Sequence, residues 1–343
     1  MTAGLENVDK AVKQGEHMRE LAASTAKVGL VMGGLGAAIA LPLKDAIEKT
    51  DQLENHMNRL MVASGKMNDP AARMQALKFV QDQAIATGYS ANDLTESLYQ
   101  GVSGFLTFDQ AMAVSTTSAK LARVTQGDLA STTGLLTTMM LNFGDATKTP
   151  LQNAQMLSDE LAALQTQFKF TDLGDLTAAM RIAAPAMLGF GIQRQQGEAI
   201  LAALSAGGDI GETGGAALRE ILAMSAKASR ELGFQVFAGP NGKGVDLLKT
   251  LDGIKARFGD ISQNKDLSAM FEHAFGRQAY SALAIVLKNL DKAHLAVTGL
   301  ANSAGTVDKG FAVFNESGSM VFDRLHQSLT AIEISVGARC YRR

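Results

Sequence analysis

The stretch Gly207–Glu220, GGDIGETGGAALRE, decides between two very different folds. Glycines and a threonine directly before a predicted helix also occur in the phosphate-binding loops of α/β enzymes. A Walker loop requires a lysine after its last glycine, whereas Ala216 follows the last glycine here. A dinucleotide-binding loop requires a preceding strand, but residues 198–204, EAILAAL, are typical of a helix. We therefore predict a glycine-rich corner between two helices.

The composition of the whole chain favours the same fold class. Of 343 residues, 46% are AVILMFWYC residues, and 19% are charged, below the roughly 25% of an ordinary soluble domain. The chain has 16 Met, four Tyr and no Trp, so its apolar surface is aliphatic and suits helix-to-helix packing. We predict a mainly α protein, built as an elongated array of short helices.

Helix start signals recur along the chain. Each places a short polar side chain where free backbone N–H groups require an acceptor, and two of them add a proline at the first helical position. These signals are Asn68-Asp69-Pro70, Ser90-Ala91-Asn92-Asp93, Thr107-Phe108-Asp109-Gln110 and Thr149-Pro150-Leu151-Gln152. The second and third resemble capping boxes.

Apolar residues between these signals have helical spacing, which indicates core packing. The stripes are Leu53, Met57, Leu60 and Met61; Leu218, Ile221 and Leu222; and Leu283, Val286, Leu287 and Leu290. One exception is residues 234–248, where a turn containing Asn241-Gly242 separates two short apolar arms and predicts a small β-hairpin. The end of the chain differs again: Phe322, Leu325, Leu329, Ile332 and Val336 alternate spacings of three and four, which predicts the start of a coiled-coil-like helix.

No residues point to catalysis, to a cofactor or to a metal. The histidines have no metal-binding spacing, no serine lies in a Gly-x-Ser-x-Gly elbow, and Cys340 is the single cysteine; the histidines are His17, His56, His273, His294 and His326. We expect the acidic pair Asp159-Glu160 to lie on a solvated helix face. With a net charge of −2 and no basic cluster, direct binding of nucleic acid is not expected. We predict that the chain is not an enzyme.

The segment 28–43, VGLVMGGLGAAIALPL, is uncharged over 16 residues, just short of a bilayer-spanning helix. It is either a tightly packed apolar helix or a membrane-inserting segment, and the sequence leaves both interpretations open. We divide the chain into 1–43, a polar helix plus this apolar glycine-rich segment; 44–290, a helical core; and 291–343, a C-terminal helical segment that ends as a truncated helix would.

The order of segments resembles the core region of phage tail tape measure proteins, a family first defined in phages of Gram-positive hosts. The resemblance runs from about Lys44 to Leu287. It rests on these segments taken in order: DQLENHM at 51–57, ATGYSANDLTESLYQGVSGF at 86–105, LARVTQGDLASTTGLLTTMMLNFG at 121–144, AAPAMLGFGI at 183–192, the glycine-rich corner, LGFQV at 232–236 and MFEHAFGRQAYSALAIVL at 270–287.

This resemblance implies a structural and assembly protein of a phage or prophage tail that sets tail length and nucleates tube assembly. The implied partners are the tail tube protein, tail assembly chaperones, the tail tip or initiator complex and further copies of the chain within the tube. The implied location is the virion tail, after assembly in the host cytoplasm. Such proteins leave the tail at infection, so residues 28–43 could then contact the host membrane. The alternative function is a membrane-active, pore-forming helical protein.

Overall fold

The computed structural model describes residues 35–341, apart from 169–172 and 210. This part of the chain is mainly α, as predicted, and contains fifteen α-helices, one 3-10 turn and no strand. The helices are α2 (Leu35–Ala63), α3 (Pro70–Thr87), α4 (Ala91–Ser103), α5 (Phe108–Thr125), α6 (Leu129–Phe143), α7 (Pro150–Phe168), α8 (Leu173–Gly189), α9 (Arg194–Ala206), α10 (Gly211–Leu232), α11 (Leu247–Phe258), α12 (Lys265–Phe275), α13 (Arg277–Lys288), α14 (Leu290–Ala301), α15 (Thr306–Asn315) and α16 (Gly318–Tyr341).

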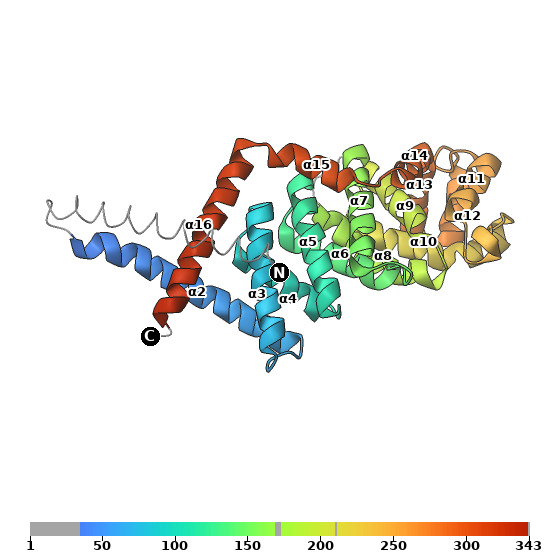
Figure 1. Ribbon diagram of the computed structural model, residues 1–343. Helices are drawn as coiled ribbons and strands as arrows, with labels where there is room; N and C mark the ends of the chain where they lie inside the picture. The colour runs from blue at the N-terminus through green and yellow to red at the C-terminus, as the bar shows by residue number, and fades with distance from the viewer. Residues whose placement is uncertain (1–34, 169–172, 210, 342–343) are drawn as a thin grey trace.

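The molecule is elongated, with α2 and α16 at one end and α11 and α12 at the other (Figure 1). The chain first travels along the array from α2 to α12 and then returns. On the way back, α14 packs against α7 and α9, α15 packs against α5 and α7, and α16 packs against α2 and α3. The predicted elongated array is therefore confirmed, and its last helices lie alongside its first.

All four predicted start signals begin a helix. The Asp69 carboxylate accepts the Ala72 N–H at 2.9 Å before α3, and Ser90 Oγ accepts the Asp93 N–H at 3.0 Å before α4. Thr107 and Gln110 exchange both bonds of a capping box at the start of α5. Thr149 and Gln152 exchange the equivalent pair of bonds before α7. Local hydrogen-bond chemistry thus places these helix starts.

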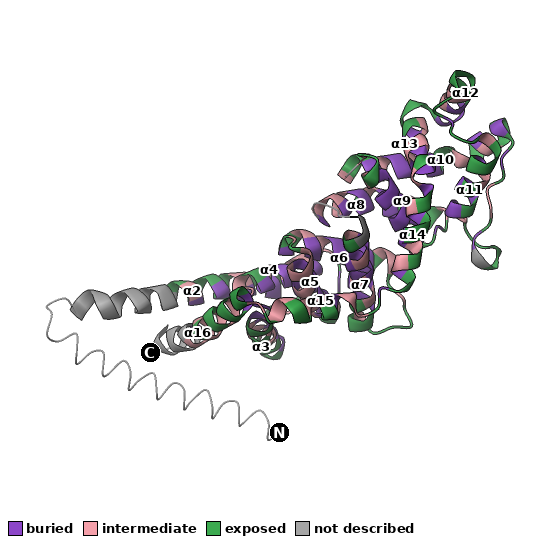
Figure 2. Cartoon of the chain, turned by 90° about the horizontal axis from the view of Figure 1, so that it is seen from above, coloured by how far each residue is buried: buried purple, intermediate pink, exposed green. Residues whose placement is uncertain are grey.

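The predicted apolar stripes form the core, and buried residues continue along the length of the array (Figure 2). The stripe that was predicted from Leu283 to Leu290 is divided between two helices, α13 and α14. Helix α13 ends at Lys288, and the Asn289 side-chain amide donates to the Ile285 carbonyl at 3.0 Å. Leu290 is consequently the first residue of α14, although it is buried like the rest of its stripe.

The glycine-rich corner is confirmed, but helix α10 begins earlier than the sequence suggests. Helix α9 ends at Ala206 and α10 begins at Gly211, so Gly214 and Gly215 lie within its first turns. A Cβ atom on Gly215 would lie only 2.3 Å from the Ala179 carbonyl oxygen of α8. The glycine therefore allows the backbones of α8 and α10 to lie in contact. Helix packing accounts for the glycine at this position.

The β-hairpin predicted at residues 234–248 is reduced to a single antiparallel bridge between Ala238 and Val245. The turn itself is present, with the Gly239 N–H donating to the Gly244 carbonyl at 2.9 Å. The arms do not extend as strands because α11 begins directly after Asp246, whose side chain caps it. The hairpin prediction is therefore wrong beyond its turn.

Residues 28–34 of the apolar segment lie outside the described residues, and α2 begins at Leu35. Within the part of the chain that is described, no helix combines the length and the apolar character that crossing a bilayer requires.

Substitution of Gly215 by Ala tests the close contact between α8 and α10. We expect a loss of about 1–3 kcal/mol of unfolding free energy, because the added methyl group collides with the α8 backbone. The matched control is Gly134→Ala in the middle of α6, where an added Cβ would have nothing within 4 Å. There the exchange should stabilise the chain by up to about 1 kcal/mol through helix propensity. Urea unfolding followed by circular dichroism measures both, and equal effects would contradict the proposed contact.

Candidate functional site

A charged cluster lies buried between helices α7 and α9. Glu160 is 4% exposed, Arg194 8% and Glu198 0%. The expectation that Asp159-Glu160 lies on a solvated face is therefore wrong for Glu160. The remaining described helices bury few charged side chains, so this cluster is the most unusual polar feature of the core.

The Arg194 guanidinium holds the cluster together. Its Nη2 lies 2.7 Å from Glu160 Oε1 and 2.6 Å from Glu160 Oε2, and its Nε lies 3.5 Å from Glu198 Oε1. The Gln195 side-chain amide also donates to Glu160 Oε1, at 3.1 Å. Neither carboxylate oxygen of Glu198 accepts a hydrogen bond from the described residues.

Two carboxylates therefore share one guanidinium in a water-poor environment. Burial raises the pKa of Glu198 well above its usual value, and the neighbouring Glu160 carboxylate raises it further. Burial also raises the pKa of Glu160, although Arg194 and Gln195 act in the opposite direction. The charge balance is satisfied when Glu198 holds a proton and Glu160 pairs with Arg194.

Asp159, the other half of the acidic pair, has a structural role of its own. Its carboxylate accepts the Gly305 N–H at 2.7 Å and the Val307 N–H at 2.9 Å, at the start of α15. A negative charge there offsets the positive end of the helix dipole. Adjacent acidic residues on α7 thus fix α9 on one side and α15 on the other.

The spacing of residues on α7 could have revealed Glu160. Leu157, Leu161 and Leu164 are buried at helical spacing, and Glu160 lies on the same face. Arg194 and Glu198 are likewise four residues apart on a helix whose following residues are apolar. An acidic residue inside an apolar stripe indicates a buried ion pair more strongly than a solvated face.

The cluster predicts how stability changes with pH. Because the pKa of Glu198 is raised in the folded state, the folded chain holds more protons than the unfolded chain above pH of about 4.5. The free energy of unfolding should therefore fall as pH rises from that value. In the Glu198→Gln variant, the side chain keeps its shape but can no longer titrate. The urea midpoint of this variant should therefore fall less steeply with pH than that of the wild type.

The control for this measurement is Glu316→Gln at an exposed position, which should keep the wild-type slope. Arg194→Met provides a second check, because it leaves two carboxylates in the core without a counter-charge and should cost about 3–5 kcal/mol. A Glu198→Gln variant with the wild-type slope would show that Glu198 does not titrate in the folded chain.

The histidines and the cysteine do not come together. His56, His273, His294 and His326 belong to α2, α12, α14 and α16, while His17 and the Cys340 side chain lie outside the described residues. His294 Nε2 lies 2.9 Å from Asp252 Oδ1 at the surface. In the described ranges, no three His, Cys, Asp or Glu residues are grouped in a way that could hold a metal ion.

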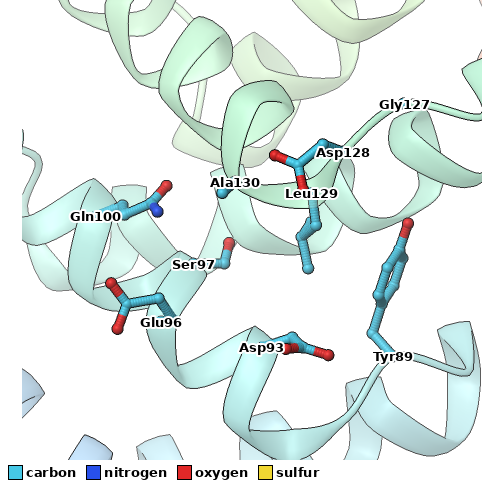
Figure 3. Close-up of a pocket in the computed structure, with 9 residues that line it drawn as sticks. All are labelled: Tyr89, Asp93, Glu96, Ser97, Gln100, Gly127, Asp128, Leu129 and Ala130. Atoms are coloured by element: carbon cyan, nitrogen blue, oxygen red, sulfur yellow. The ribbon is translucent and has the colours of Figure 1, made fainter. Parts of the chain in front are cut away.

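A shallow acidic pocket of about 330 Å³ opens between α4 and α6, and Figure 3 shows the side chains that line it. Asp128 accepts the Ser131 N–H at 2.7 Å and so caps α6. Glu96 pairs with Arg59 of α2 at 3.4 Å. Ser97 Oγ lies 2.9 Å from Thr133 Oγ1, which ties it to α6 without a neighbouring base. Asp128, Glu96 and Ser97 therefore hold helices together, and the Ser97 hydroxyl is paired with another hydroxyl and not with a base that would activate it as a nucleophile.

The family described as "Phage-related minor tail protein" matches residues 73–276. The chain belongs to this phage tail protein family. The match begins within α3 and ends at Gly276, the residue that caps α12. No curated protein and no solved structure matches the chain significantly.

Membership in this family makes the chain a structural protein of the phage tail. The matched region contains most of the outward path of the array, from within α3 to the end of α12, and includes the buried charged cluster. Helices α2 and α13–α16 lie outside it. Glu160, Arg194 and Glu198 accordingly lie within the matched region, whereas the returning helices lie outside it.

Proposed function

We propose that this chain is the core region of a tail tape measure protein, which sets tail length and nucleates assembly of the tail tube. The observation that carries the proposal is the tail-family match over residues 73–276, on an elongated array made only of helices in its described part. The order of sequence segments from Lys44 to Leu287 resembles the tape measure core and extends the argument beyond the match. The acidic net charge of −2 fits a protein whose contacts are with other proteins.

The folded-back path suggests which part of the task this region performs. A ruler converts residue number into length at about 1.5 Å per residue of continuous helix. Here α14, α15 and α16 return along the array, so added residues would not add length in proportion. We therefore assign this region to anchoring and initiation, with length measured by a continuous helical region of the tape measure.

The partners that this role requires are the tail tube protein, the tail tip or initiator complex and tail assembly chaperones. Several large apolar side chains are exposed on the chain before assembly: Met67, Met74, Phe105 and Val313 are 64%, 70%, 89% and 73% exposed. Such residues favour aggregation when they are not covered. A chaperone that covers them in the host cytoplasm until the tube forms fits this surface.

Deletion of the gene in the producing phage tests the proposal. We expect tubes to be absent or to have a broad length distribution in electron micrographs, and the intact gene supplied in trans should restore one defined length. The Gly134→Ala variant is a suitable control, because it should restore the same length as the wild type. Tails of wild-type length assembled without this chain would contradict the proposed role.

We also propose that the chain leaves the tail at infection and that residues 28–43 contact the host membrane. A charged residue in this apolar segment should oppose insertion, so Leu35→Lys should yield intact tails that fail to deliver DNA. Failure of tail assembly in this variant would instead assign the segment to packing within the particle. Electron microscopy and a DNA-release assay on the same preparation separate the two results.

A further inference from the structure

Helices α15 and α16 run along the outside of the array and bury few of their side chains (Figure 1). Among the side chains that the structure describes between residues 306 and 334, only Val307, Met320 and Ile334 are buried. Helix α9, in the middle of the array, buries ten of its thirteen residues. Burial of apolar surface is the main term that holds a helix in place, so α15 and α16 should separate from the body at a lower free energy than α9.

Surface ion pairs also attach these two helices to the body. At α15, Lys120 Nζ of α5 lies 2.7 Å from Asp308 Oδ1, and the two side chains are 30% and 60% exposed. At α16, Arg123 Nη1 of α5 lies 3.1 Å from Asp323 Oδ2, and these side chains are 26% and 44% exposed. Ion pairs that are this open to water contribute little stability, and salt screens them.

Hydrogen bonds to the backbone complete the attachment. The Asp159 carboxylate accepts the N–H groups of Gly305 and Val307, and Arg324 Nε donates to the Ile85 carbonyl at 2.9 Å. The net contribution of such bonds is modest, because the same groups bind water once they are apart.

Separation of α15 and α16 would leave no fully buried charge without a partner. Arg123 keeps two other partners on the body, because its Nε donates to the Thr87 carbonyl at 3.1 Å and its guanidinium lies 4.2 Å from the centre of the Tyr89 ring. Asp308 and Asp323 would pass into water with their helices. The charged cluster between α7 and α9 differs, because its groups are removed from water and depend on one another.

The chain has a joint between α14 and α15. Helix α14 is anchored by four buried apolar residues and ends at Ala301. Residues 302–305 follow, and Gly305 has a φ of 78°, which glycine adopts without steric cost. Beyond this joint the two helices are tied to each other, because Arg324 Nη1 donates to the Asn315 side-chain oxygen at 2.8 Å. They can therefore move together.

We propose that α15 and α16 form a strap, residues 306–341, that opens as one unit about residues 302–305 while α2–α14 stay folded. The folded-back arrangement is the closed form of this strap. Opening uncovers the faces of α3 and α5 on which the strap lies and releases α16 from α2. The inference rests on the proposed function for its role: the closed strap keeps the chain folded back before assembly, and opening lets the chain after α14 extend along the tail.

Hydrogen exchange of the purified full-length chain, followed by mass spectrometry, measures this opening. Between about 50 mM and about 1 M NaCl, the amides of α15 and α16 should exchange about tenfold faster, because salt screens both ion pairs, while those of α9 should not change. The double variant Asp308→Asn/Asp323→Asn should show the faster rate already at low salt. The matched control is Asp291→Asn, an exposed carboxylate in the first turn of α14, which should exchange like the wild type.

An engineered disulfide tests whether the strap moves as one unit. A Cβ atom on Gly310 would lie 3.6 Å from the Val124 Cβ, a separation that a disulfide can bridge. In a Cys340→Ser background, the oxidised Val124→Cys/Gly310→Cys chain should exchange the amides of both α15 and α16 about tenfold more slowly, and salt should no longer accelerate them. The reduced form of the same variant is the control and should regain the salt dependence of the wild type.

Amides of α15 and α16 that exchange as slowly as those of α9 would overturn the proposal, and so would rates that neither salt nor the double variant changes. Exchange of α16 that the disulfide on α15 does not slow would show two independent helices and would equally contradict the strap. All of these measurements use the isolated chain, so their failure leaves the gene-deletion test of the proposed function unaffected, and the reverse also holds.

Discussion

The architecture depends on helix backbones that touch at small residues. The contact between Gly215 of α10 and Ala179 of α8 leaves no room for a Cβ atom, and the two helices are fixed at the distance that glycine allows. Gly207, the residue that caps the end of α9, is also crowded, although by a side chain: a Cβ atom there would lie 2.2 Å from Cγ2 of Ile285 in α13. Where two helix backbones touch, a position without a side chain sets the distance between them, because a close-packed interior has no room for added atoms.

We propose that the charged cluster adds specificity to this apolar packing. Apolar helices can slide past one another at small cost, but a buried guanidinium requires its carboxylate at one position only. Arg194 and Glu160 thereby fix α9 against one side of α7, and the adjacent Asp159 fixes α15 against another. Helix α15 depends on such polar contacts in particular, since Val307 is its one buried residue, whereas α14 buries four apolar residues.

Local features of this fold were predictable from the sequence, and long-range ones were not. The predictions of helix caps at Asp69 and Thr107 were correct because each cap joins residues only three positions apart, which a local sequence pattern can encode. The return of α16 to α2 joins residues almost the whole chain apart, and no local pattern encodes it. The hairpin prediction was wrong because α11 begins at Leu247, so the residues expected to form the second strand belong to a helix. Glu160 was misjudged because adjacent acidic residues suggested solvent, whereas the helical period places only one of them in the core.

We propose that this chain is a low-copy component of the tail that initiates assembly of the tube. Quantitative peptide mass spectrometry on purified tail particles tests it most directly, by comparing peptides of the chain with peptides of the tube protein. We expect a few copies of this chain per particle, far below the number of tube subunits. A copy number that matches the tube protein, or absence of the chain from particles, would contradict it.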